Sequence, residues 1–286
     1  MYMDREFLIG VELNSKSITA GLVDLSGKIV KKISLPSEIS KGKKKVIENI
    51  ASAINRIKKN KILGVGLSVP GIVNREKGIV ISSPFPGWSN FCLKKLLEDE
   101  VHCPVFVENE GKCFALAEYK CGVFKRTENA IGVLFNDSIS SGLIIDGKLA
   151  KGCSYAAGCL NYSIVDNRQG TLEDYAAPAA IEKLFKARTR KAKPIAEIVS
   201  LDNDKIAKEI LKNAGEYFGI SMSHLVNALN PELIIVGGPM AKSEHFMTAA
   251  ESSLLSNTSD MCGKRVKLIG SKLNDSAILG AASIVI

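Results

Sequence analysis

Aromatic residues and long hydrophobic runs are scarce in this chain, and each scarcity excludes a class of protein. Aromatic residues make up 6% of the 286 residues, and no apolar run approaches the roughly 20 residues of a membrane-spanning helix. The first residues mix acidic and basic groups and lead directly into a strand-like segment, which is not the pattern of a signal peptide. We therefore expect a cytoplasmic protein that does not contact a membrane.

Disulfide and zinc motifs are also missing. The chain has seven cysteines, an odd number without a CxxC pair, and three histidines. A disulfide framework needs an even set at close spacing, and a structural zinc needs about four Cys or His ligands. We expect no zinc and no disulfides, with most of the cysteines buried as small apolar residues.

Acidic residues are outnumbered, which gives a net charge of +8. The basic residues gather in three short groups, at 41–45, 56–61 and 186–193, without interleaved aromatic residues. Solvated surfaces explain these groups, and a surface for DNA or an acidic partner is the alternative. We expect no direct nucleic-acid binding, and we predict an exposed loop over 186–194.

One pattern occurs twice. Residues 9–24 and 131–146 each contain an apolar strand, a short polar turn and a second apolar strand, and a Gly-Lys turn suited to a hairpin follows each copy. Apolar periodicity predicts further elements between and after the copies. One helix is expected over 44–57, one begins at a cap at Asn90, one follows the strand 105–107 and runs through 118, and two more cover 204–229 and 276–286. Strands are expected over 62–69, 105–107 and 233–236. The pattern predicts a duplicated α/β protein with a cleft between two lobes.

The motifs, in their order, resemble the ROK family of bacterial sugar kinases and sugar-responsive repressors. Those that carry the resemblance are residues 10–24, Ser68-Val69-Pro70-Gly71, Pro86-Gly87-Trp88, residues 105–109, residues 145–148, Gly170-Thr171-Leu172-Glu173, and Asn230-Pro231-Glu232 with Gly237-Gly238. The resemblance implies an α/β, duplicated two-lobe actin/hexokinase-like (ribonuclease H-like) fold with an interlobe cleft. We expect the lobes at 1–118 plus 275–286 and at 119–274.

The two turns that hold nucleotide phosphates in the family are altered here. The family has an acidic residue followed by Gly-Gly-Thr in the first turn, whereas this chain lacks both glycines, so its backbone cannot approach a phosphate as closely. The second turn has a carboxylate in place of the family's Gly-Thr-Gly, and like charges repel a polyphosphate. The vestigial nucleotide-binding residues are Glu12, Asn14, Lys16, Asn136, Asp137, Gly237 and Gly238.

The family's catalytic base is an Asp after Asn, and Glu110 stands at that place. The extra methylene moves the carboxylate by about 1 Å, which can cost roughly a hundredfold in rate. Asn109 is retained and could bind a sugar hydroxyl, as could Gly71 of the earlier motif. The alternative interpretation of Asn109 and Glu110 is a helix cap with a first-turn carboxylate, and the two roles are compatible.

The sugar-binding segment is altered as well. The family's Gly-Glu-Ile-Gly-His aligns with 158–162, so Cys159 replaces the Glu that holds two hydroxyls and Tyr162 replaces the His. We expect Cys159 to be a buried inert thiol, with a reactive thiol as the alternative. The shortened loop 164–171 lacks the family's three zinc-binding cysteines. Trp88 is either a sugar-stacking face or a core residue.

These changes favour a regulatory protein over an enzyme. The first hypothesis is a catalytically impaired ROK protein that senses a sugar or another metabolite, forms a homodimer and has no helix-turn-helix of its own. It would need no cofactor. The alternative is an ATP-dependent sugar kinase of unusual substrate that uses Glu110 as base with ATP and Mg²⁺. A third, weaker hypothesis is a partner-binding protein with a vestigial cleft.

Overall fold

The computed structural model describes residues 6–59, 61–124, 127–166, 170–201 and 203–286. They divide into two compact units, and each is built on its own five-stranded sheet. The first unit takes its described residues from 1–125, 151–157 and 273–286, and the second from 126–150 and 158–272. The expected lobe boundaries, 1–118 plus 275–286 and 119–274, stay a prediction.

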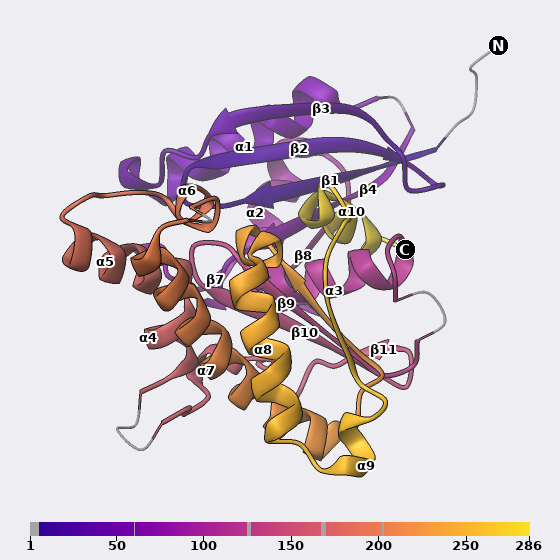
Figure 1. Cartoon of the computed structure of the whole chain (residues 1–286). Coiled ribbons are helices and arrows are strands. Elements are labelled where there is room, and N and C mark those ends of the chain that lie inside the picture. Colours follow the sequence, from indigo (N-terminus) through magenta and orange to yellow (C-terminus); the bar gives the residue numbers. More distant parts are fainter. Residues whose placement is uncertain (1–5, 60, 125–126, 167–169, 202) are drawn as a thin grey trace. The chain divides into compact units, whose positions relative to one another are not determined.

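The sheet of the first unit has the strand order β3-β2-β1-β4-β8 (Figure 1). Its strands are β1 (Phe7–Leu13), β2 (Ser17–Asp24), β3 (Ile29–Pro36), β4 (Ile62–Val69) and β8 (Val105–Asn109). The first three form an antiparallel meander, and β1, β4 and β8 run parallel. A separate three-stranded sheet contains β5 (Ile72–Asn74), β6 (Ile79–Ser82) and β7 (Ser89–Cys92).

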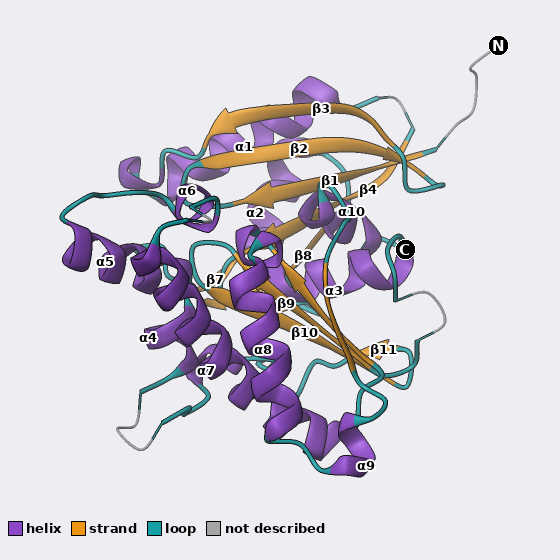
Figure 2. Ribbon diagram, in the orientation of Figure 1, coloured by secondary structure: helices purple, strands orange, loops and turns teal. Residues whose placement is uncertain are grey.

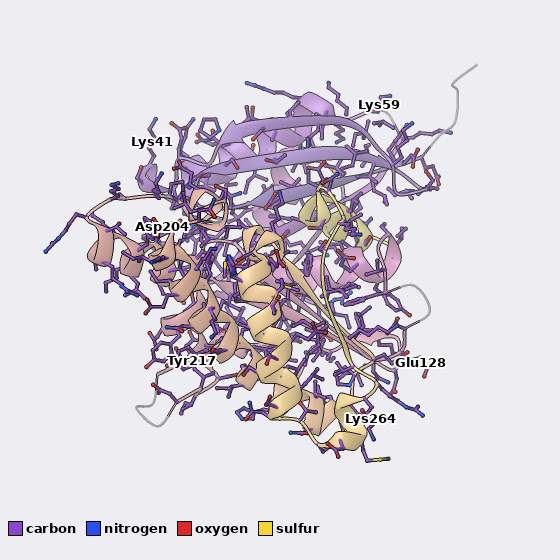
Figure 3. The ribbon with its side chains drawn as sticks, viewed as in Figure 1. Lys41, Lys59, Glu128, Asp204, Tyr217 and Lys264 are labelled. Atoms are coloured by element: carbon purple, nitrogen blue, oxygen red, sulfur yellow. The ribbon has the colours of Figure 1, made fainter. Side chains whose placement is uncertain are left out.

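The helices of the first unit pack against its sheet, except for a short 3-10 helix that has no buried residues. They are η1 (Ile39–Lys41), α1 (Lys43–Ile57), α2 (Leu93–Val101), α3 (Glu110–Lys120) and α10 (Ser276–Ser283). Lys41 and Lys59, labelled in Figure 3, flank α1. The C-terminal helix α10 is buried from Ala277 to Ser283 and packs against α3, β1 and β4 (Figure 1). It ends before the expected residue 286.

The sheet of the second unit repeats this arrangement with the order β11-β10-β9-β12-β13 (Figure 2). Its strands are β9 (Ala130–Phe135), β10 (Ile139–Ile145), β11 (Lys148–Leu149), β12 (Leu233–Gly237) and β13 (Lys267–Gly270). Again the first three are antiparallel, and β9, β12 and β13 run parallel. Asp146 and Gly147 turn β10 into β11 with positive φ, 50° and 70°. The predicted duplication is confirmed.

A helical layer covers the second sheet. It consists of η2 (Leu160–Tyr162), α4 (Leu172–Ala176), α5 (Pro178–Thr189), α6 (Ile195–Val199), α7 (Lys205–Leu229), η3 (Pro239–Lys242), α8 (Glu244–Ser256) and α9 (Asp260–Gly263). The long helix α7 begins after Asp204, whose carboxylate caps it, and it carries Tyr217 at its middle (Figure 3). Phe135, Phe218 and Phe246 meet in the core between sheet and helices, with ring centroids 5.3 to 5.4 Å apart.

Three expectations about local structure are wrong. The loop expected over 186–194 is in part a helix: α5 continues to Thr189, and only residues 190–194 lie outside α5 and α6. Lys186 and Arg188 fit the helix because their side chains are exposed on its surface. Asn90 does not cap a helix; it lies in β7 with φ 47°, and α2 begins at Leu93. Among the cysteines, Cys113 is buried, whereas Cys153 and Cys159 are exposed and the other four are half-buried.

In the part of the chain that the structure describes, no helix combines the length and the apolar character that crossing a bilayer requires.

Candidate functional site

The turn between β1 and β2, the first candidate phosphate turn, is closed by its own side chains. The Oδ1 atom of Asn14 accepts hydrogen bonds from the backbone N–H groups of Lys16 at 3.0 Å and Ser17 at 2.8 Å. Ser37, which is fully buried, donates its hydroxyl to the Ser15 carbonyl at 2.9 Å and its N–H to the Lys16 carbonyl at 3.1 Å. Phosphates bind such turns through backbone N–H groups. Here two of these groups already have an acceptor.

Polar side chains gather where the three parallel strands of the first sheet end. Glu12 on β1 is in register with Ser68 on β4, and Ser68 is in register with Glu108 on β8. Ligands of open α/β sheets bind beyond the carboxyl ends of parallel strands. The structure therefore places Glu12, from the candidate nucleotide turn, in one row with the strand that leads to Asn109 and Glu110.

Glu108 is a buried carboxylate that the sequence analysis did not select. Its side chain is 1% exposed, and burial raises its pKa above the ordinary value. The nearby Lys112, the N–H of Asn109 at 2.7 Å and the Nε of Arg75 at 3.9 Å partly offset this effect. The signal in the sequence is an acidic residue that continues the apolar run of β8.

Asn109 both caps α3 and fastens the neighbouring loop. Its Oδ1 accepts from the backbone N–H of Lys112 at 3.1 Å, and its Nδ2 donates to the Gly71 carbonyl at 2.8 Å. Gly71 has φ 111°, and a Cβ there would lie 2.1 Å from the Ser82 carbonyl oxygen. Glu110 is the first residue of α3 and is 6% exposed. The helix-cap interpretation is confirmed, and a role of Gly71, Asn109 and Glu110 toward a ligand stays a prediction.

The second candidate phosphate turn lies between β9 and β10, next to the end of β12. The N–H of Asn136 donates to the Ser138 carbonyl at 3.1 Å, and Asp137 is exposed at the tip. Gly237 is in register with Leu134 on β9, one residue before Phe135. A Cβ on Gly238 would lie 2.0 Å from the Phe135 carbonyl oxygen. The structure thus brings the predicted nucleotide-binding residues of the second unit together, and the carboxylate of Asp137 lies outermost among them.

The candidate sugar segment forms a short 3-10 turn, η2, and the expected burial of Cys159 is wrong. Leu160 occupies the buried position of this turn at 8% exposed, which leaves Cys159 exposed and Tyr162 72% exposed on either side. The hydroxyl of Ser141 on β10 donates to the Gly158 carbonyl and fastens the start of the segment. Both side chains therefore face solvent, and their contact with a ligand stays a prediction.

The loop that replaces the family's zinc loop is closed by hydrogen bonds. Asp166 accepts from the Tyr175 hydroxyl at 2.5 Å and from the Gly170 N–H at 2.9 Å. Residues 167–169 of this loop lie outside the described part of the chain. Among the residues that the structure describes, no group of three or more His, Cys, Asp or Glu side chains is placed to hold a metal ion. The described side chains of the loop do not supply the ligands of a closed zinc site. The absence of zinc stays a prediction.

Glu173, which follows this loop, is a second carboxylate that the sequence analysis used only as a family motif. Its Oε2 accepts from the Ile139 N–H at 3.1 Å, at the start of β10. The side chain is half-buried, and this burial raises its pKa. Its place in the first turn of α4, two residues after the Thr171 cap, was the available signal.

Trp88 is a core residue. It is 2% exposed and packs edge-on against Phe85 and Phe91, with centroid distances of 5.5 and 5.3 Å. The sugar-stacking interpretation is therefore wrong, because the ring is covered by its own unit.

Comparisons with known proteins agree with the fold and the motifs. The ROK family profile matches residues 8–286. An uncharacterised protein of Clostridium perfringens is 30% identical over 276 residues, 93% of each chain. The xylose repressor of Bacillus subtilis is 28% identical over 299 residues, 98% of this chain and 77% of the repressor.

Among solved structures, a ROK family glucokinase from Streptomyces griseus in complex with glucose and AMPPNP has a TM-score of 0.86, is 22% identical, and matches over 97% of this chain and 98% of its own. This likeness confirms the predicted two-fold repeated α/β fold of the actin/hexokinase type. The chain belongs to the ROK family.

Proposed function

We propose that this ROK protein is a regulatory module that binds a sugar or a related metabolite, forms a homodimer and has little or no kinase activity. The closed turn at Asn14 is the observation that carries the proposal. Phosphoryl transfer depends on positioned backbone donors and on charge stabilisation around the phosphates. A phosphate at this turn would have to displace the Asn14 side chain from the Lys16 and Ser17 N–H groups.

The second turn supports the same conclusion. Asp137 is exposed at its tip, so a bound polyphosphate would meet a negative charge. Two unit charges about 4 Å apart repel by about 4 kcal/mol at an effective dielectric of 20. No magnesium-bound nucleotide step is therefore part of the proposed function.

The sugar half of the proposal rests on residues that are retained and on the relatives. Asn109 and Gly71 are held in one hydrogen-bonded arrangement beside the buried Glu110. Relatives include a xylose repressor and a glucokinase, and both names refer to sugars. A neutral sugar or a sugar derivative is accordingly the proposed ligand class.

A coupled assay at millimolar ATP and Mg²⁺ tests the catalytic half, with glucose, N-acetylglucosamine, mannose, fructose and xylose as substrates. We expect background turnover from the parent protein, from Glu110→Asp, and from the triple variant Asn136→Gly, Asp137→Thr, Ser138→Gly. Residues that act as a unit are not rescued one at a time. A parent turnover of about 1 per second or more on any sugar, within the usual kinase range, contradicts the proposal.

The regulatory half is tested by thermal shift with the same sugars and their phosphate esters, without nucleotide. Binding to the folded state raises the free energy of unfolding by RT ln(1 + [L]/Kd), and with it the unfolding temperature. We expect at least one sugar or sugar phosphate to raise it, and light scattering to give twice the mass of 30.8 kDa. A monomer that none of these ligands stabilises contradicts this half.

The second candidate function is a sugar kinase that uses Glu110 as base. The position of Glu110, directly after Asn109 and at the first residue of α3, favours it. In that case Glu110→Gln abolishes a measurable turnover, whereas Glu110→Asp keeps or raises it.

A further inference from the structure

The segment Lys151–Ala157, called the strap below, packs with the first unit although the chain on both sides of it belongs to the second. It has little regular structure, and the Ala157 N–H donates to the Lys151 carbonyl at 3.3 Å, which closes it into a loop. Within it Tyr155 has φ 62°, the left-handed region that non-glycine residues rarely adopt. Such a conformation persists where surrounding contacts determine it.

Tyr155 is held at both of its polar ends. Its hydroxyl donates to Oε2 of Glu76, in the turn between β5 and β6, at 2.7 Å. Its carbonyl accepts from the ammonium of Lys112 at 2.7 Å. Lys112 is 3% exposed and belongs to the first turn of α3, two residues after Glu110. A buried ammonium needs its acceptors, so this bond is costly to break.

Glu76 fastens the strap at a second point as well. Its other oxygen, Oε1, accepts from the Lys151 ammonium at 2.7 Å. One carboxylate therefore holds the beginning of the strap and its tyrosine, and both bonds lower the pKa of Glu76, that from Lys151 more than that from Tyr155. The strap thus ends in a fixed conformation, one residue before the candidate sugar segment.

The first residue of that segment is equally constrained. Gly158 has φ 93°, and a Cβ on it would lie 2.8 Å from the Ser141 carbonyl oxygen. Leu160 then donates its N–H to the Gly158 carbonyl at 2.7 Å, and Ser163 donates to Leu160 at 2.9 Å. The segment therefore begins at a residue that is packed against β10 and follows directly on the strap at Ala157.

We propose that Tyr155, with its anchors Glu76 and Lys112, is a positioning residue that sets the conformation of the candidate sugar segment 158–162. The proposal rests on the proposed function only in so far as that segment binds the ligand. The contact from Lys112 also links the strap to the helix turn that carries Glu110. Glu76 therefore controls ligand affinity from outside the candidate ligand residues.

Hydrogen exchange of the full chain, followed by mass spectrometry, tests the proposal without a ligand. We expect Glu76→Ala and Tyr155→Phe each to raise exchange at Ala157, Leu160 and Ser163 by about fivefold or more, because local opening becomes easier. The double variant should match Glu76→Ala alone, because both changes act through one carboxylate. Glu76 and Tyr155 lie near the surface, so both variants are expected to fold.

Glu209→Ala is the matched control. Glu209 has the same side-chain exposure as Glu76, 55%, and pairs with Arg188 at 3.0 Å on helices α7 and α5. Its removal should leave exchange at Leu160 and Ser163 unchanged. Unchanged exchange at these two positions in Glu76→Ala and Tyr155→Phe, even with a looser strap, overturns the proposal.

Titration calorimetry with D-glucose and D-xylose adds the functional measurement. Where the parent binds either sugar, Glu76→Ala should weaken the affinity about fivefold or more, and Glu209→Ala should not. An unchanged affinity overturns the positioning role. A parent that binds neither sugar counts against the proposed sugar ligand, and exchange at Leu160 and Ser163 alone then decides the role of the strap.

Discussion

The side-chain oxygen of Asn14 lies 2.8 Å from the backbone nitrogen of Ser17 and accepts its hydrogen. The same oxygen accepts from Lys16, so the β1–β2 turn binds its own side chain where a phosphate-binding turn offers free N–H groups. The turn lacks the two glycines of the family, and the side chain of Asn14 occupies the backbone N–H groups of the same turn.

Replacing Asn14 separates the structural effect of the closure from its effect on nucleotide binding. We expect Asn14→Gly to lower the free energy of unfolding by about 1 kcal/mol, because hydrogen bonds of this kind contribute that much. Calorimetry should show tighter Mg-ADP binding than in the parent, while turnover stays at background. Asn49→Ala, which removes donors to Pro36 and Glu38, should leave nucleotide affinity unchanged. Nucleotide affinity that does not rise in Asn14→Gly contradicts the interpretation of the closed turn.

The cysteines should react in the order of their exposure. Pulse alkylation of the native protein is expected to label Cys153 and Cys159 first and Cys113 last, because Cys113 is buried and burial raises its pKa well above the ordinary value. Mass spectrometry of the labelled peptides measures the order. Early labelling of Cys113 under native conditions would show that α3 opens readily.

The loop closed by Asp166 should be stable without metal. We expect Tyr175→Phe to lower the free energy of unfolding by about 1 kcal/mol, because it removes the hydrogen bond to Asp166. A chelator should leave the unfolding temperature of the parent unchanged, and elemental analysis should find no stoichiometric zinc. Zinc at one equivalent in protein purified without a metal-binding tag refutes this prediction.

Glu173 and Asp174 are neighbours on α4 whose pKa values move in opposite directions. Burial raises the pKa of Glu173 above its ordinary 4.5. Hydrogen bonds from Thr171 lower the pKa of Asp174 below its ordinary 3.8. A raised pKa makes the folded state less stable as pH rises from the unfolded pKa through the folded one. A lowered pKa adds stability above the unfolded pKa, and this is lost as pH falls through the folded one.

Two variants should therefore show opposite pH profiles. Relative to the parent, Glu173→Gln should gain stability as pH rises above about 4.5. Asp174→Asn should lose most stability near neutral pH and least at pH values below the lowered pKa of Asp174. Thermal unfolding across this range measures both. Profiles parallel to that of the parent would mean that neither carboxyl is coupled to folding.

The C-terminal helix α10 depends on glycine in the sheet beneath it. A Cβ on Gly66 of β4 would lie 1.6 Å from the Ala281 carbonyl oxygen. We expect Gly66→Ala to lower the free energy of unfolding by about 3 kcal/mol, because two backbones would have to separate. Gly263→Ala is the control, since its Cβ meets its nearest atoms at 3.7 Å, and a change within about 0.5 kcal/mol is expected there. Urea unfolding compares the two, and equal effects would contradict the close packing of α10.

Local patterns in the sequence determined the repeated part of the fold. Two apolar strands around a short polar turn predict a hairpin, so both copies, β1–β2 and β9–β10, could be predicted, and the Gly-Lys turn after each copy leads into β3 or β11. The Asn109 cap was visible for the same reason, because a cap bonds to a residue three positions along its own helix. The long helix α7, with its cap at Asp204, follows from periodicity alone.

Only the tertiary structure decided which side chains are buried and what they contact. Leu160 takes the inner position of η2, so Cys159 faces solvent, although the apolar neighbours of Cys159 suggested burial. Lys112 and Tyr155 are separated by 43 positions in the chain, yet one bond joins them. Burial and such contacts depend on segments that the fold brings together from distant positions, and no local pattern contains that information.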